Sequence, residues 1–330
     1  MSNGDDISVS VILPVYNGGK HLYESLGSIL SQTYSDFEVI IINDGSTDDS
    51  VSVIQKFKDP RIRYHEQSNQ GLAATLNRGI GLSRGRYLAR QDQDDISLPK
   101  RFEKQVDFLE SHPSHGMVGT WAKIKGQDEN IYRAHRHPAD SLRLKFELLF
   151  NNPFVHSSVM IRKNVFKKVG GYSTNTLRQP PEDYELWSRV AREFKVANIP
   201  EILHVYREVP GSMSRDGINP FLERVMNISA ENLAWTTGRQ KEDRDIRDYI
   251  ALIHGAHYRL SPRPDREGIS KLLYEAADHL SDSAHADRDI LREVVHARLQ
   301  SIVRPCLQHR YGKIMCRVLE RFYKPKELTR

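Results

Sequence analysis

Two apolar runs near the N-terminus constrain the fold of this chain more than any other feature. Residues 7–15 (ISVSVILPV) and 37–42 (FEVIII) have the length and composition of strands buried on both faces, as in a parallel sheet. Each run is followed by a turn and then by a segment with helical spacing of apolar residues. After the first run, these residues are Leu22, Leu26, Ile29 and Leu30. Such alternation predicts an α/β domain.

The alternation continues through the first two thirds of the chain. The expected further strands are residues 61–65, 86–91 and 155–162. Helices are expected at 72–82, after Pro99, and from residues 180–183 onward. Ser46, with Asp49 three residues later, predicts a capping box at the start of another helix.

Strand signals stop near residue 218. The amphipathic helices expected beyond that point are residues 221–236, 245–260, 266–280, 284–303 and 311–322. We therefore predict an α/β domain over residues 1–217, with a mixed sheet flanked by helices, and an all-helical region over residues 218–330.

Composition favours a globular chain in a reducing compartment. No run of residues approaches the ~18–20 apolar residues that a membrane helix needs, and the start of the chain does not resemble a secretion signal. The only cysteines, Cys306 and Cys316, form neither a disulfide framework nor a metal-ligand pattern. These features predict a cytoplasmic protein.

The formal net charge of +5 is concentrated at the C-terminal end. Residues 301–330 contain eight basic and two acidic side chains, a net +6. Such a segment could contact an anionic membrane, here the inner face, or simply form a solvated helix face. A nucleic-acid partner is not expected, because few aromatic residues are interleaved with the basic ones.

Three polar clusters follow predicted strands, at the sheet edge where α/β proteins bind ligands. They are residues 14–17, 43–46 and 92–95. The chain has no G-x-G-x-x-G loop to cradle a pyrophosphate. The acidic cluster Asp92-Gln93-Asp94-Asp95 could instead hold Mg²⁺ or Mn²⁺, which prefer oxygen ligands, and so neutralise a diphosphate. The alternatives are a solvated acidic loop and, for Asp44-Gly45, an ordinary turn.

Glu182 and Asp183 open a predicted helix. The helix dipole favours ionised carboxylates in the first turn, which would leave Asp183 able to accept a proton. The alternative is that both carboxylates merely cap the helix.

Several linked motifs resemble family 2 glycosyltransferases over residues 7–214. The motifs are VSVILPVYN, SILSQTYSDFEVIIINDGSTDDS, RYLARQDQDDISLPKRFEKQ, HSSVMIRK, GGY and PEDYELW. The resemblance implies a GT-A, Rossmann-like fold and transfer with inversion. It also implies that Asp44 hydrogen-bonds the base of the donor, usually uracil, in a pocket lined by Pro14 and Tyr16.

The resemblance extends to the remaining site residues. Asp92 and Asp94 match the DxD pair, with Asp94 or Asp95 as metal ligand, and Asp183 matches the general base. Arg207, Ser212 and Ser214 resemble the late loop that closes over the diphosphate. The predicted site is completed by Asn17 and Gln93 on the donor side and by Glu182 and Trp187 as acceptor or supporting residues.

Two positions depart from the family pattern. Asn43 stands where an aspartate is usual, and Gln93 stands where a small residue is common, so its longer side chain could alter the sugar pocket. The expected function is transfer from a nucleotide sugar, preferably a UDP-sugar, to a hydroxyl of a glycan or lipid-linked acceptor, with Mn²⁺ or Mg²⁺. A non-catalytic nucleotide-sugar or carbohydrate-binding relative is the alternative, which Asp94 and Asp183 argue against.

Overall fold

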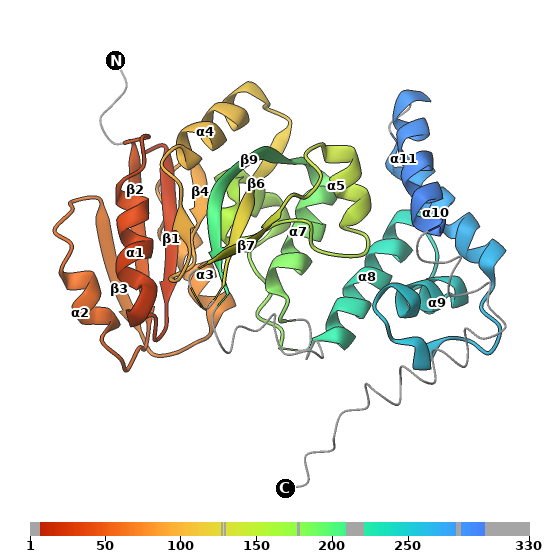
Figure 1. Cartoon of the computed structure of the whole chain (residues 1–330), viewed down its shortest axis with the longest axis horizontal. Coiled ribbons are helices and arrows are strands. Elements are labelled where there is room, and N and C mark those ends of the chain that lie inside the picture. Colours follow the sequence, from red (N-terminus) through yellow and green to blue (C-terminus); the bar gives the residue numbers. More distant parts are fainter. Residues whose placement is uncertain are drawn as a thin grey trace, which may run out of the picture. The chain divides into compact units, whose positions relative to one another are not determined.

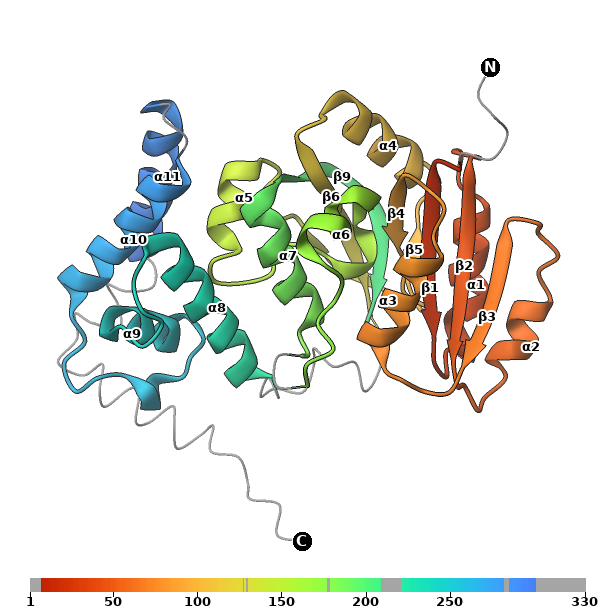
Figure 2. The ribbon, with the colours of Figure 1, turned by 180° about the vertical axis from the view of Figure 1, so that it is seen from behind.

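The computed structural model describes residues 7–126, 128, 130–176, 179–208, 221–281 and 285–300. The chain divides into two compact units. One comprises residues 1–144 and 152–220, and the other comprises residues 145–151 and 221–330. Figures 1 and 2 show a sheet with helices on both faces in the first unit and helices in the second.

The described part of the first unit forms a nine-stranded mixed sheet in the order β3-β2-β1-β4-β8-β6-β9-β5, with β7 paired to β6. Strands β1 (Val9–Val15), β2 (Phe37–Asp44), β3 (Ile62–Gln67) and β4 (Tyr87–Arg90) are parallel. Their carboxyl ends therefore meet at one edge. Strand β8 (Met160–Arg162) runs antiparallel to both β4 and β6 (His115–Lys125).

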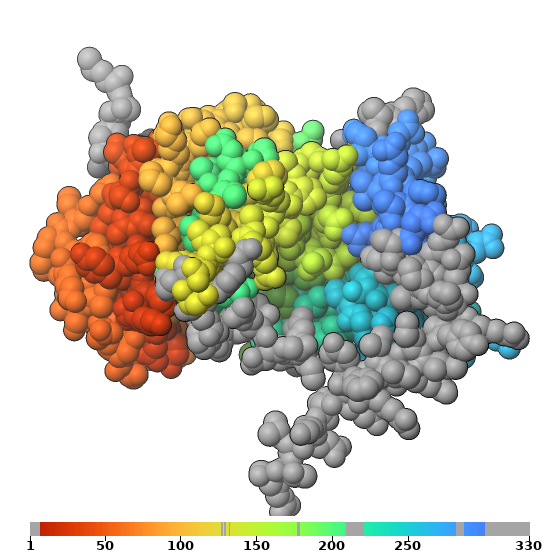
Figure 3. Space-filling model, in the orientation of Figure 1, coloured from red at the N-terminus to blue at the C-terminus, as the bar shows by residue number. Residues whose placement is uncertain are grey.

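Side chains of β1 alternate between two helical layers. Val9, Val11, Leu13 and Val15 pack into one core with apolar residues of α1 (Gly19–Leu30), α2 (Ser50–Gln55) and α4 (Arg101–Ser111). Ile12 faces α3 (Leu72–Leu82), where a Cβ at Gly79 would lie 2.5 Å from Ile12 Cγ2. Glycine thus permits the close approach of α3. Helix α1 lies in front of the sheet in Figure 1, and its residues, in red, reach the surface in Figure 3.

The predicted strands and helices of the first hundred residues are present, but the capping box is not. Helix α2 begins at Ser50 with Asp49 as its N-cap, and the Asp49 side chain makes no capping hydrogen bond. Ser46 instead accepts a hydrogen bond from the backbone N–H of Asn17 (3.0 Å). A tertiary contact has replaced the local one.

The second half of the sheet was poorly predicted. Strands β6 and β9 (Lys195–Arg207) contain buried polar residues that hide their apolar pattern. The described side chains of β7 (Ile131–His135) are exposed or half-buried, so this strand shows no buried apolar pattern. Pro200 interrupts β9, and the pairing with β6 shifts there from Thr120–Ile199 to Trp121–Ile202. Residues 155–162 form a short 3-10 turn, His156–Ser158, before β8, where one strand was expected. Strand β5 (Ile96–Ser97) pairs with β9.

Other helices of the first unit are α6 (Lys163–Val169) and α7 (Glu182–Glu193), while α5 (Ser141–Glu147) crosses the division between units. The second unit contains α8 (Leu222–Thr237), α9 (Arg244–Ile253), α10 (Arg266–Leu280) and α11 (His285–Arg298). Helix α9 stops earlier than predicted, at His254-Gly255, where Gly255 has φ +70°. The helix predicted at 311–322, both cysteines and the basic segment lie outside the described residues. Among the described helices, none combines the length and apolarity needed to cross a membrane.

Candidate active site

The loop between β1 and α1 cannot cradle a phosphate with its backbone. Four consecutive backbone N–H groups, those of Tyr16, Asn17, Gly18 and Gly19, donate hydrogen bonds of 2.9–3.0 Å to side chains. In the same order, the acceptors are Gln93, Ser46, Ser50 and Asp48. Because these donors are already used, a diphosphate bound at this edge of the sheet would have to be neutralised by other groups.

Gln93 connects two loops of the site. Its Oε1 accepts from the Tyr16 N–H (2.9 Å), and its Nε2 donates to the Tyr16 carbonyl (3.1 Å). A Cβ at Gly18 would lie 2.3 Å from Gln93 Oε1, so glycine leaves room for this contact. The long Gln93 side chain therefore reaches back to the β1–α1 loop, and the Tyr16 side chain stays half exposed (50%). Asn17 has φ +50°, and its Oδ1 accepts from the Thr47 N–H (2.8 Å).

Asp44 lies at the end of β2, but its carboxylate is engaged within the protein. Oδ1 accepts from Gln67 Nε2 (2.7 Å) and the Gln70 N–H (2.9 Å), and Oδ2 accepts from the Gly71 N–H (2.9 Å). The residue is only 4% exposed. In this structure Asp44 fixes the segment before α3 and does not present a free carboxylate to a nucleotide base. Pro14, on β1, is likewise buried.

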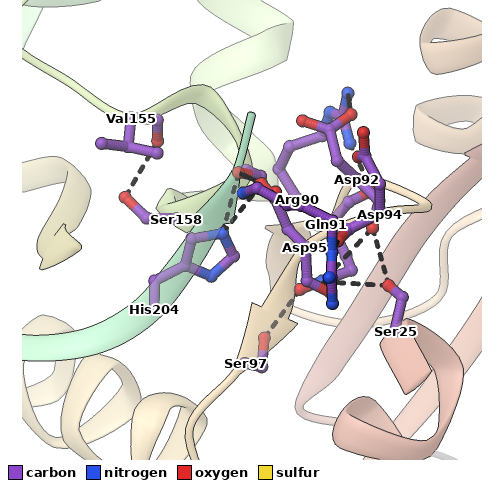
Figure 4. Close-up of polar contacts among 12 residues, drawn as sticks. Ser25, Arg90, Gln91, Asp92, Asp94, Asp95, Ser97, Val155, Ser158 and His204 are labelled. Atoms are coloured by element: carbon purple, nitrogen blue, oxygen red, sulfur yellow. Dashed lines mark hydrogen bonds and ion pairs between the residues drawn. The ribbon is translucent and has the colours of Figure 1, made fainter. Parts of the chain in front are cut away.

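A buried polar layer supports the acidic loop 92–95 (Figure 4). Gln91 Nε2 donates to the Asp95 carbonyl (2.8 Å) and contacts Ser25 Oγ of α1 (3.2 Å). Arg101, wholly buried, donates to Gln91 Oε1 (2.9 Å) and to the Arg90 carbonyl (2.7 Å). Burial lowers the pKa of Arg101 to about 9, so the side chain is cationic at neutral pH. A buried guanidinium, that of Arg101, therefore supports the residues that precede the acidic loop.

Both carboxylate oxygens of Asp95, predicted with Asp94 as a possible metal ligand, have partners within the protein. Oδ1 accepts from the Arg207 N–H (2.8 Å), and Oδ2 is hydrogen-bonded by Ser157 and lies 3.1 Å from His204 Nε2. The Asp95 side chain is 1% exposed, so it offers no oxygen to an ion from solvent. Burial also lowers the pKa of His204 well below its ordinary value, which keeps the imidazole neutral.

Arg207, predicted to close over the diphosphate, contacts the acidic loop from the end of β9. Its Nε donates to the Asp94 carbonyl (3.0 Å), and a terminal nitrogen pairs with Glu24 of α1 (2.5 Å). The side chain is buried, which suits a residue that holds Asp94 in place from β9. Its predicted neighbours Ser212 and Ser214 lie outside the described residues.

Asp92 and Asp94 are half-buried and have different partners. Asp92 pairs with Arg90 at 2.6 Å. No described lysine or arginine pairs with the Asp94 carboxylate. Burial, with the negative charges of Asp92 and Asp95, raises the pKa of Asp94. A carboxyl in this setting is stabilised in its ionised form by an added cation.

Asp183 is held by two N–H donors at the start of α7. Its Oδ2 accepts from Asn152 Nδ2 and its Oδ1 from the Tyr184 N–H, both at 2.7 Å. Burial raises the pKa of Asp183 to about 6, although these hydrogen bonds and the charge of Arg90 favour the ionised form. Burial and the neighbouring Asp183 raise the pKa of Glu182 to about 7. Arg90 thus interacts with both the acidic loop and this carboxylate pair.

An aromatic cluster lies behind the pair. His156 Nε2 lies 3.0 Å from the Tyr172 hydroxyl, and its Nδ1 lies 3.7 Å from Glu182 Oε1. Trp187 stacks edge-on against His156 and is 0% exposed. Trp187, predicted with Glu182 as an acceptor or supporting residue, packs within this cluster.

Sequence reasoning missed several residues of the site. Arg90 and Arg101 carried one available signal, since each is a cation within an otherwise apolar strand or helix face. Asn152, His156 and Tyr172 carried none, because only the fold brings them to Glu182 and Asp183.

Comparisons with known proteins agree with this architecture. The family model described as glycosyl transferase family 2 matches residues 10–170. EpsE of Bacillus subtilis is 36% identical over 216 residues, which cover 63% of this chain and 75% of EpsE. The O-antigen biosynthesis glycosyltransferase WbnJ of Escherichia coli is 32% identical, over 60% of this chain and 79% of WbnJ. The amylovoran biosynthesis glycosyltransferase AmsE of Erwinia amylovora is 32% identical, over 59% and 74%.

Solved structures show the same fold. S. aureus TarS 1–349 in complex with UDP-GlcNAc superposes with a TM-score of 0.59 at 18% identity, over 93% of this chain and 87% of that one. The mannosyltransferase PcManGT from Pyrobaculum calidifontis, in complex with GDP-Man and Mn²⁺, has a TM-score of 0.50 at 16% identity, over 96% and 87%. The mixed sheet, with an acidic loop at the carboxyl ends of its parallel strands, defines a glycosyltransferase of the GT-A class. Within that class, the chain belongs to glycosyl transferase family 2.

Proposed function

We propose that this glycosyltransferase moves a sugar from a nucleotide sugar to an acceptor hydroxyl by a single displacement with inversion, and that Asp183 is the general base. The observation that carries this proposal is the setting of Asp183. It is a half-buried carboxylate oriented by two N–H donors, and it shares Arg90 with the acidic loop.

In the proposed reaction the acceptor oxygen bonds to the anomeric carbon while the bond from that carbon to the diphosphate breaks. The hydroxyl proton passes to the Asp183 carboxylate, and the nucleoside diphosphate leaves. A base whose pKa is raised towards neutrality accepts a proton more strongly than an ordinary aspartate does. Asn152 and Tyr184 hold the two Asp183 oxygens in place, so little reorientation is needed.

The acidic loop fits a divalent cation that is only partly ligated by protein. No described group of three or more His, Cys, Asp or Glu residues could hold a metal ion by itself. Mg²⁺ sites commonly use one or two carboxylates together with substrate phosphates, and Asp94, with Asp92 beside it, provides such a donor set. A bound Mg²⁺ or Mn²⁺ would offset negative charge on the diphosphate. We assign Asp94, and not Asp95, to this role.

A uridine nucleotide is the proposed donor. The fold likeness to TarS, which was solved with UDP and with UDP-GlcNAc, supports this choice, although PcManGT was solved with GDP-Man. The exposed Tyr16 side chain, held by Gln93, is the proposed wall of the donor pocket. The acceptor is proposed to be a hydroxyl of a glycan or lipid-linked glycan, in keeping with the O-antigen and amylovoran relatives.

The domain assignment is part of the proposal. We assign donor binding and catalysis to residues 1–217, and acceptor presentation to the helical residues 218–330. Peripheral contact with the inner face of a membrane is proposed for the segment 301–330 on its charge alone.

The test is an assay of nucleoside diphosphate release from a panel of nucleotide sugars in the presence of Mn²⁺ and a glycan acceptor. The proposal expects acceptor-dependent UDP release and a product of inverted anomeric configuration. A product of retained configuration would overturn the assignment of a single displacement.

A further inference from the structure

Residues 145–151 connect the two units in an unusual way. Residues before and after this segment, 1–144 and 152–220, belong to the first unit, whereas residues 145–151 themselves belong to the helical unit. The first residue after the segment is Asn152, whose side chain donates the 2.7 Å hydrogen bond to Asp183. The residue that orients the candidate base thus follows directly on a segment anchored in the other unit.

Three side chains of the helical unit anchor this segment. From α8, Asn232 Nδ2 donates to the Leu148 carbonyl (2.9 Å) and Ser229 Oγ donates to the Phe150 carbonyl (3.1 Å). From α11, Arg298 pairs with both oxygens of Glu147 (2.6 and 2.5 Å). The segment is therefore fixed at residues 147, 148 and 150.

Apolar packing fixes it further. Phe150 meets the ring of Tyr249 from α9 edge-on, with 5.3 Å between centroids, and the Arg298 guanidinium lies 4.5 Å from the Phe150 ring. Phe150 and Tyr249 are fully buried. Close-packed side chains of this kind transmit displacements to their neighbours because they have little free volume.

Asn152 also has contacts inside the first unit. Its Oδ1 accepts from the Phe154 N–H (3.1 Å), and the next carbonyl, that of Pro153, accepts from Asn198 Nδ2 (3.1 Å). Asn152 is therefore held from both sides, by β9 through Asn198 on one side and by the anchored segment on the other.

We propose that Asn152 is a positioning residue for Asp183, and that the helical unit sets its position through the anchored segment 145–151. This inference rests on the proposed function of Asp183. It gives the helical unit a part in catalysis that is separate from contact with an acceptor.

The test uses the full-length protein and compares kcat, donor KM and the pH dependence of kcat. The groups that act on Asp183 are Arg90 of β4, Glu182 and the Tyr184 N–H of its own helix, Tyr172 and Asn152. In Asn152→Ala only the last is lost. We expect kcat to fall about 10- to 100-fold, as misplacement of a catalytic group does, with donor KM unchanged. In the pH profile of kcat, the decline on the acid side should also move to higher pH by about half to one pH unit. The reason is that the ionised Asp183 carboxyl loses a hydrogen bond, which raises its pKa.

Asn232→Leu and Ser229→Ala test the part of the helical unit. As in Asn152→Ala, each substitution should lower kcat, here by about twofold to thirtyfold, and leave donor KM unchanged. Each should also move the decline of kcat on the acid side to higher pH. The matched control is Asp248→Ala, which removes a buried side-chain acceptor from the Ser261 N–H (2.8 Å) in the same unit but does not contact the segment. This control should keep the wild-type kcat and pH profile. Calorimetric binding of UDP shows in each variant that the first unit is folded.

Two results would overturn the inference while leaving the proposed function intact. One is a wild-type pH profile and kcat in Asn152→Ala. The other is behaviour of both Asn232→Leu and Ser229→Ala that matches Asp248→Ala. A wild-type rate in Asp183→Asn would instead overturn the proposed function itself, so the two failures are distinguishable.

Discussion

The side-chain amide of Gln93 makes two hydrogen bonds to the backbone of Tyr16, one to its N–H at 2.9 Å and one from Nε2 to its carbonyl at 3.1 Å. The contact joins the acidic loop after β4 to the loop after β1. It also depends on Gly18, where any side chain would displace Gln93.

The first prediction concerns this contact. Gln93→Ala should raise the KM for the nucleotide sugar about 3- to 10-fold with little change in kcat, since two modest hydrogen bonds that hold the proposed donor pocket are lost. Gly18→Ala should have a similar effect because its Cβ excludes the Gln93 amide. Steady-state kinetics of the single and double variants check this, and a double variant whose effects simply add would contradict a shared contact.

The second prediction is a pH dependence. A general base acts when ionised, and the pKa of Asp183 is raised to about 6, so kcat should fall as the pH is lowered through about 6. Glu182, with its pKa raised to about 7, should broaden the decline. The measurement is kcat at saturating donor and acceptor between about pH 5 and about pH 8. A flat profile would argue against a titrating base in this position.

The third prediction concerns metal removal. UDP should bind about tenfold or more weakly after EDTA treatment, since the diphosphate loses the counter-charge held by Asp94, and added Mn²⁺ should restore the affinity. Calorimetry with and without EDTA measures the difference. Equal UDP affinities with and without EDTA would contradict the proposal that a divalent cation takes part in UDP binding.

The fourth prediction concerns stability at the opposite end of the sheet. Glu38 of β2 is buried and accepts hydrogen bonds from Ser10 (2.6 Å), Arg63 (2.7 Å) and the Arg84 N–H (2.8 Å). Although burial alone would raise it, these contacts lower its pKa from 4.5 to about 2. The stabilisation is therefore complete above pH 4.5 and is lost as the pH falls towards about 2.

Glu38→Gln should lower the free energy of unfolding at neutral pH by about 2–3 kcal/mol. The control is Glu201→Gln, which removes one exposed ion pair with Lys104 and should cost at most about 1 kcal/mol. Urea denaturation of the two variants gives the comparison. Equal small losses would show that the Glu38 network contributes little.

The order of helices and strands along the chain could be predicted from the sequence, but the hydrogen-bond partners of individual side chains could not. Helix α3 was predicted at its observed bounds, because an apolar face and flanking turn residues are local signals. Asp95 and Arg207 are 112 positions apart in the chain and hydrogen-bond through the pairing of distant elements. Nothing at either position distinguishes a structural aspartate from a metal ligand.

Buried polar residues account for the other failures. Arg207 lies at the end of β9, a strand whose apolar pattern is broken by Asn198, Pro200 and His204, so the strand was missed. Trp187 had the helical spacing of a core residue, and the structure places it there.

The most direct test of the central claim compares Asp183→Asn with Asp94→Ala in both UDP binding and transfer. Asp183→Asn is nearly isosteric and should bind UDP with Mn²⁺ as the wild type does, while transfer falls by about 10²–10⁴. Asp94→Ala should lose metal-dependent UDP binding and transfer together. An Asp183→Asn enzyme that binds UDP normally and transfers at the wild-type rate would contradict the account.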